Sequence, residues 1–124
     1  MENLTETQWA WIAGIFEGEG CFSFTNKWPV CYIQMTDKDV MEKISSYLDV
    51  PIGKPKKLKS GKLAYSIAFR KTEKLKYLYE NIYGYMGERR KRSLSKWQEF
   101  WDNKNLQKSG NADISLLNIN MISS

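Results

Sequence analysis

The sequence predicts an α+β fold with the element order α-β-β-α-β-β-α. Apolar residues recur at helical spacing in four segments and alternate with polar residues in two paired segments that read as β-hairpins. Four antiparallel strands can then form one sheet with helices covering a single face, which leaves the other face free for a ligand. With 124 residues, we expect one domain over 1–102 and a weakly structured or short helical tail over 103–124.

The first half of the chain is expected to contain a helix and a hairpin. The helix is predicted from about Glu6 to Gly18, because Thr5 and Gln8 have the spacing of a capping box and apolar residues follow at helical spacing until glycines stop the pattern. The hairpin is predicted from the alternation over 21–25 and 30–36.

The alternation in this hairpin also assigns its two cysteines to faces. The residues 26–29 contain Asn and Pro and are predicted to form the turn, so that Thr25 pairs with Val30. Cys21 and Cys31 then point to opposite faces of the sheet. We therefore expect two packing thiols without a disulfide.

The second half repeats this arrangement and ends in helices. Pro51 stops a helical stripe, and a Ser-Gly pair marks the turn of a lysine-rich hairpin. The expected elements are a helix over 37–48, strands over 53–58 and 62–70, a helix over 72–83 and a last helix that follows the basic run 89–92 and passes through Trp101.

Composition narrows the chemistry that the chain can perform. It has no histidine, which excludes Ser-His-Asp and Cys-His catalysis and histidine-ligated zinc and leaves carboxylate chemistry. A formal charge of +5 favours a polyanionic partner. No apolar run approaches the roughly 20 residues that span a bilayer. We expect a soluble intracellular protein in a reducing compartment, the cytoplasm or an organelle matrix, without a membrane partner.

Small residues form a strip along the first helix. Ala10, Gly14 and Gly18 lie four residues apart, so one face carries almost no side chain. Such a strip lets two helix backbones approach closely, a rule best documented in membranes. Spacing alone gives equal weight to a pair of such helices and to packing on another element of the same chain.

Two glutamates lie at the end of this helix, where the helix dipole disfavours negative charge. Glu17 and Glu19 would gain from a compensating hard cation such as Mg²⁺, and a second carboxylate from a symmetry mate would complete a shared two-metal site for phosphodiester attack. Considered without context, a solvated acidic turn is the commoner outcome for such a pair.

The segment Ile12–Gly20 resembles the signature motif of the LAGLIDADG homing endonucleases. It aligns without a gap, with identities at Ala13, Gly14 and Gly20 and conservative matches at four further positions. The expected element order also agrees with the family over roughly the first 100 residues. Because the chain holds one motif, the resemblance implies a homodimer that cuts double-stranded DNA at a long pseudo-palindromic site, in the service of intron or intein mobility.

The resemblance also implies roles for particular residues. Glu19, in place of the usual aspartate, would bind Mg²⁺ or Mn²⁺ together with the carbonyl of Gly18, and Asp37 would help to hold water. Arg89 or Arg90 would stabilise transition-state charge, and we assign Arg89 to this role and Arg90 to DNA contact. Glu17, at the earlier acid of the motif, would have a structural role and cap or orient the helix end. The dimer interface would comprise Ala10, Gly14, Glu17 and Gly18.

Strand parity predicts a polar face suited to base edges in the major groove, beside a patch of lysines suited to phosphates. The face comprises Ser23, Thr25, Tyr32, Gln34, Ser66 and Arg70, and the lysines are Lys27, Lys54, Lys56, Lys57, Lys59 and Lys62. A DNA-binding regulator or an RNA-splicing maturase on the same fold, without cleavage, remains the main alternative. A structural dimer with an inert acidic helix end is a third reading.

Overall fold

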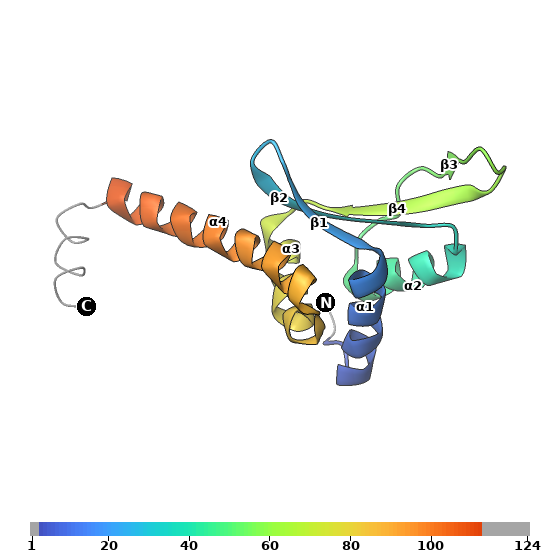
Figure 1. Cartoon of the computed structure of the whole chain (residues 1–124), viewed down its shortest axis with the longest axis horizontal. Helices are drawn as coiled ribbons and strands as arrows, with labels where there is room; N and C mark the ends of the chain where they lie inside the picture. Colours follow the sequence, from blue (N-terminus) through green and yellow to red (C-terminus); the bar gives the residue numbers. More distant parts are fainter. Residues whose placement is uncertain (1–2, 113–124) are drawn as a thin grey trace. The chain divides into compact units, whose positions relative to one another are not determined.

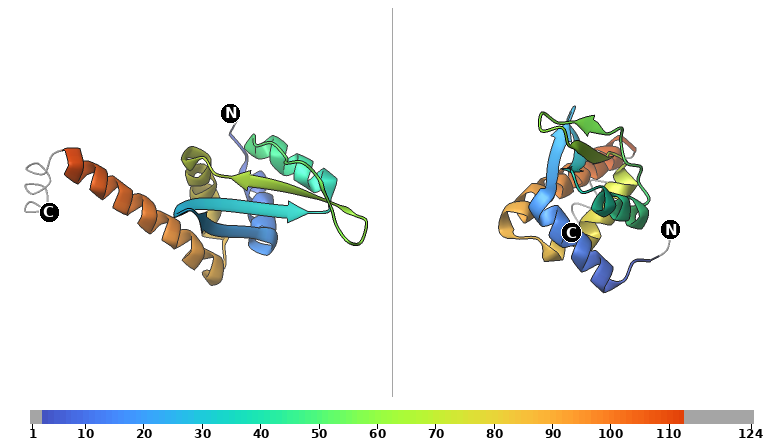
Figure 2. Two further views of the ribbon diagram at one scale, coloured as in Figure 1. Left: turned by 90° about the horizontal axis from the view of Figure 1, so that it is seen from above. Right: turned by 90° about the vertical axis from the view of Figure 1, so that its right-hand side faces the viewer.

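A four-stranded antiparallel sheet organises the first part of the chain in the computed structural model, which describes residues 3–112. The strands are β1 (Gly20–Thr25), β2 (Trp28–Met35), β3 (Lys56–Lys57) and β4 (Leu63–Phe69), in the order β1-β2-β4-β3. The helices α1 (Glu6–Glu19), α2 (Lys38–Leu48) and α3 (Thr72–Ile82) lie on one side of this sheet (Figures 1 and 2). The predicted α+β class and the single covered face are thereby confirmed.

The chain divides into two compact units, Met1–Leu94 and Ser95–Ser124. A short 3₁₀ helix, η1 (Tyr83–Tyr85), follows α3, and α4 (Glu88–Ala112) continues past residue 102. The domain boundary at residue 102 stays a prediction, and most of the expected tail lies outside the described residues. None of the described helices is long and apolar enough to cross a membrane.

The core of the first unit lies between the sheet and its covering helices. Thr5 and Gln8 form the predicted capping box at the start of α1, with hydrogen bonds of 3.1 and 2.8 Å. The helix then buries Phe16, whose ring stacks on Phe22 of β1 at 6.3 Å and meets Phe69 of β4 edge-on at 5.8 Å. These contacts fix the end of α1 against β1 and β4.

The register of the first hairpin differs from the prediction by two residues. Asn26 and Lys27 alone form the turn, with φ of 51° and 70°, so Thr25 pairs with Trp28 rather than with Val30. Positive φ at both central residues gives a turn whose twist matches that of the flanking strands. A shift of two residues preserves side-chain parity, so the assignment of residues to faces holds.

The two cysteines lie on opposite faces, as predicted. Cys21 is exposed, Cys31 is buried, and both are free thiols. Burial raises the pKa of the Cys31 thiol well above its usual value, and the nearby Cys21 adds to the effect. Cys31 is therefore a neutral packing residue.

The lysine-rich strand is much shorter than the expected 53–58. Only Lys56 and Lys57 pair with β4, opposite Ala64 and Leu63. Pro55 has no N–H to donate, so the ladder cannot continue through it. Single backbone bonds, from Gly53 N–H to the Ser66 carbonyl and from Leu58 N–H to the Lys62 carbonyl, hold the rest of the segment beside β4.

We expect Gly20→Ala to destabilise the fold by about 1–3 kcal/mol, because overpacking forces the surrounding structure to move. A Cβ at Gly20 would lie 2.7 Å from the carbonyl oxygen of Phe16, which accepts the Gly20 N–H bond. Gly84→Ala is the matched control, since a Cβ there meets no described atom within 4 Å. Urea unfolding monitored by circular dichroism measures both, and equal midpoints would contradict the prediction.

Candidate functional site

The two glutamates at the end of α1 point to different surroundings. Residues two positions apart in a helix are separated by about 200° around its axis, so Glu17 and Glu19 leave the helix on nearly opposite sides. Glu17 faces the start of α4, whereas Glu19 is exposed and faces the end of β2. Glu17 and Glu19 therefore do not form one cluster within a single chain.

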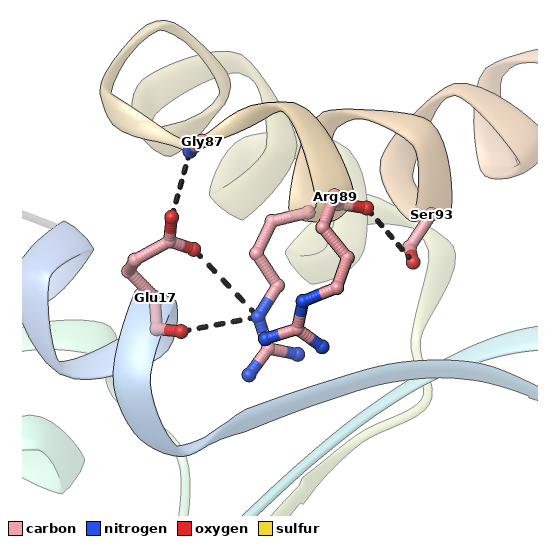
Figure 3. A network of polar contacts seen from close by, with 5 residues as sticks. Glu17, Gly87, Arg89 and Ser93 are labelled. Carbon is pink, nitrogen blue, oxygen red and sulfur yellow. Dashed lines mark hydrogen bonds and ion pairs between the residues drawn. The ribbon is translucent and has the colours of Figure 1, made fainter.

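Glu17 is bound within its own chain. Its Oε1 accepts a hydrogen bond of 2.7 Å from the N–H of Gly87, immediately before the first residue of α4 (Figure 3). Its backbone carbonyl accepts a bond of 3.1 Å from Nε of Arg90, and the same Nε lies 3.6 Å from its Oε2. A carboxylate at a helix N-terminus is stabilised by the exposed N–H groups and the dipole.

Glu19 shares a pocket of about 290 Å³ with Asp37. The pocket is lined by Glu19, Gln34, Met35, Thr36, Asp37, Leu58 and Ala64. Asp37 is the N-cap of α2 but its side chain makes no cap hydrogen bond, and both carboxylates belong to exposed residues. Two of the three predicted catalytic residues therefore meet at one cavity, at the edge where α1 and β2 end.

The donor atoms around this pocket suit a hard divalent cation. Carboxylate and backbone carbonyl oxygens are the protein ligands that Mg²⁺ prefers, and Mg²⁺ takes six ligands in total. Within residues 3–112, no three acidic or cysteine side chains converge as a metal site. The Glu19 carboxylate fits such a cation in kind, Asp37 is the other carboxylate of the lining, and Gly18 precedes Glu19 in the chain without itself lining the pocket.

The strip of small residues on α1 is exposed. Ala10, Gly14 and Gly18 are all accessible, and a Cβ built at either glycine meets no atom of the described chain within 4 Å. The apolar residues Trp9 and Ile12 are buried on another side of the helix. Of the two explanations of the strip, packing against another element of the same chain does not occur within the part that the structure describes.

The uncovered face of the sheet carries the polar residues that parity predicted. The strand pairing places Gln34 opposite Ser66 and Cys21 opposite Tyr32, and the Tyr32 hydroxyl donates a 3.0 Å hydrogen bond to Gln34 Oε1. All the residues predicted for this face are exposed except Ser66, which is half-buried.

Sequence reasoning missed Trp28 on this face. Its side chain is 54% exposed, and it lies opposite Thr25 at the tip of the first hairpin. The turn predicted over 26–29 places Trp28 outside the strands. The available signal was the pair Asn26-Lys27, since asparagine tolerates the positive φ that a two-residue turn needs.

The predicted basic residues divide into exposed and enclosed ones. Lys27, the five lysines of the second hairpin and Arg89 are exposed. Lys56 pairs with Ala64, which lies two residues before Ser66 and therefore on the same, uncovered face of the sheet. Lys57 pairs with Leu63 and points to the other face. Arg90 differs from all of these, because its side chain is only 13% exposed.

Comparison of folds finds solved structures of homing endonucleases, although no family model and no curated protein matches the sequence. Homing endonuclease I-CvuI with its target superposes with a TM-score of 0.59 at 15% identity over 82% of this chain and 71% of that one. The archaeal intron-encoded homing endonuclease I-Vdi141I, complexed with DNA, also superposes with a TM-score of 0.59. The sequence identity is 19%, and the match covers 90% of this chain and 76% of that one.

A third solved structure gives the same result at a lower score. Homing endonuclease I-TnaI superposes with a TM-score of 0.53 at 20% identity, over 79% of this chain and 71% of that one. Another structure of I-CvuI, with the I-CreI target, matches over 66% of its own length. The chain therefore has the fold of the homing endonucleases, and the resemblance seen in its α1 motif is confirmed at the level of the fold.

Proposed function

We propose that this chain is one subunit of a homodimeric, divalent-metal-dependent endonuclease that makes double-strand breaks in DNA at a long pseudo-palindromic site. The observation that carries the proposal is the position of the Glu19–Asp37 pocket at the end of a helix whose strip of small residues is exposed. The fold supports it, since I-CvuI and I-Vdi141I with the same fold were both solved with DNA.

The exposed strip accounts for the second subunit. Gly14 and Gly18 allow the backbone of a second α1 to approach closely, and a two-fold axis along such a seam brings the two helix ends together. Each Glu19 then lies near the Glu19 of the partner. This arrangement supplies the donors that a single chain lacks, and it relates the two DNA half-sites by the same symmetry.

The residues around the pocket have distinct roles in this proposal. Glu19 and the Gly18 carbonyl hold the cation, Mg²⁺ or Mn²⁺, which when bound supplies Lewis-acid stabilisation of the charge on the phosphodiester. Asp37 accepts a hydrogen bond from the water that lies over the phosphate and orients it. Arg89, exposed on the first turn of α4, donates to the phosphoryl oxygens as their charge grows.

The uncovered sheet face and the lysine hairpin supply DNA binding. Tyr32 and Gln34 are linked by their hydrogen bond, which fixes the direction of both side chains towards base edges. The lysines lie in the adjoining hairpin, where they neutralise phosphates without reading sequence. Trp28 adds an exposed aromatic ring at the tip of the other hairpin.

Lys56→Met is expected to weaken DNA binding more than Lys57→Met does. Lys56 points to the uncovered face, so its replacement should remove one phosphate contact. The slope of the logarithm of the DNA-binding constant against the logarithm of the salt concentration should then decrease in magnitude by about one. Lys57 is the matched control with the same charge on the adjacent position. Fluorescence anisotropy with a 30-base-pair duplex over a salt series measures both slopes, and an equal decrease for the two variants would refute the assignment.

Cleavage of a plasmid library with randomised inserts tests the proposed function directly. The protein is incubated with the library and Mg²⁺, and the broken ends are sequenced. The expected product is a set of double-strand breaks at one pseudo-palindromic sequence, abolished by EDTA. Tight, metal-independent binding to a recovered sequence without broken ends would instead indicate a DNA-binding regulator, and preferential binding of intron RNA would indicate a maturase.

A further inference from the structure

Arg90 occupies a more enclosed environment than the adjacent Arg89 at the start of α4. Its side chain is 13% exposed, its Nε donates to the Glu17 carbonyl at 3.1 Å, and its guanidinium lies 5.6 Å from the centre of the Phe22 ring. Arg89, the preceding residue, is exposed. Two adjacent arginines of the same basic run therefore have separate tasks.

The carboxylate of Glu17 explains why a cation is needed at this position. Oε1 accepts the Gly87 N–H, while Oε2 is buried without a hydrogen bond and lies 3.6 Å from Nε of Arg90. A desolvated carboxylate oxygen is costly unless a positive charge compensates it. Arg90 supplies this charge, so the guanidinium is engaged inside the protein.

The contacts of Glu17 with Gly87 and Arg90 fix the last turn of α1 to the start of α4. The Glu17 carbonyl and carboxylate are fixed to the start of α4, and the Gly20 N–H is fixed to the Phe16 carbonyl. Gly18 and Glu19 lie between these two anchors. The direction in which Glu19 leaves the helix is therefore set by residues that do not touch the Glu19–Asp37 pocket.

We propose that Arg90 is a positioning residue that acts with Glu17 to orient the Gly18 carbonyl and the Glu19 carboxylate, and that it does not contact DNA phosphate. The inference rests on the proposed function for the reaction that Glu19 serves. It replaces the role in DNA contact that the basic run alone suggested for Arg90.

DNA binding measured without metal distinguishes a positioning role of Arg90 from a contact between Arg90 and DNA phosphate. Arg90→Met is compared with Arg89→Met on a 30-base-pair mixed-sequence duplex over a salt series. A phosphate contact contributes about one to the log–log slope. We expect Arg89→Met to lower the slope and Arg90→Met to leave it unchanged, and a loss of about one for Arg90→Met would overturn the proposal.

A double-mutant cycle with Glu17→Gln tests the second half of the inference. Urea unfolding of both single variants and of Glu17→Gln/Arg90→Met is expected to show strong non-additivity, since each single change removes the same interaction. On the cleavable plasmid, Arg90→Met should lower kcat by about 100-fold through misplacement of Glu19, with KM little changed. Arg90→Lys, which keeps the charge, should recover part of kcat.

The outcomes distinguish this inference from the proposed function. Wild-type protein that binds DNA but never cuts would count against the nuclease, and the salt slope and the unfolding cycle would still decide the role of Arg90. Additive unfolding energies would show that Glu17 and Arg90 are not coupled and would overturn the inference even if the wild type cuts. For Arg90→Met, a rise in KM with unchanged kcat would also overturn the inference.

Discussion

Glu19→Gln is expected to lower the rate of DNA cleavage by about 1000-fold or more, because the amide cannot supply the negative charge that a divalent cation requires. DNA affinity should stay within about 2-fold, since Glu19 is neither one of the polar residues of the sheet face nor one of the lysines, although it shares a pocket with Gln34. The stability of the fold should also be unchanged, because Glu19 is exposed. Plasmid linearisation, measured under single-turnover conditions over a range of Mg²⁺ concentrations, gives the rate.

Two further variants identify the cause of that loss. Glu19→Asp restores the residue usual at this position of the motif, so it should cut DNA with an altered dependence on Mg²⁺ concentration. Asp37→Asn should lower kcat less than Glu19→Gln does, because Asp37 is proposed to orient water and Glu19 to hold the cation. Cleavage by Glu19→Gln at the wild-type rate would show that the metal-binding carboxylate lies elsewhere.

Gly14→Leu is expected to produce a folded, inactive monomer. In the single chain a Cβ at Gly14 meets no described atom within 4 Å, and leucine is a better helix former than glycine by about 0.5–1 kcal/mol. The leucine side chain would, however, hold two α1 backbones apart. Sedimentation velocity reports the oligomeric state, and circular dichroism reports the fold.

The matched control for this variant is Ser46→Leu, which adds a leucine at an exposed position on α2, outside the strip. It should leave the dimer and its cleavage intact. An active dimer from Gly14→Leu would refute the seam along α1.

Local patterns were sufficient to predict α1 and the two faces of the sheet. The capping box at Thr5 and Gln8 involves residues three positions apart, so the sequence shows both partners at once. Side-chain parity along a strand likewise depends only on the alternation within that strand. The assignment of side chains to the two faces was therefore correct although the register of the first hairpin was wrong by two residues.

Features that depend on distant partners were not predictable in this way. Glu17 and Arg90 are 73 positions apart, and a run of four basic residues gives no sign that one of them is enclosed. The length of β3 depends on Pro55 and on the pairing that β4 offers, rather than on the lysines that suggested a strand. The Glu19–Asp37 pocket required the placement of α1 beside the end of β2, which only the folded chain shows.

Under the proposed function, the opposite directions of Glu17 and Glu19 would allow the protein to lose its chemistry without losing its architecture. A chain that keeps Glu17 but replaces Glu19 would retain the junction between α1 and α4. One substitution could thus convert a cutting protein into a binding one. If the proposed roles hold, the residue at position 19, considered beside an intact acid at position 17, separates cutting from binding-only forms of this chain.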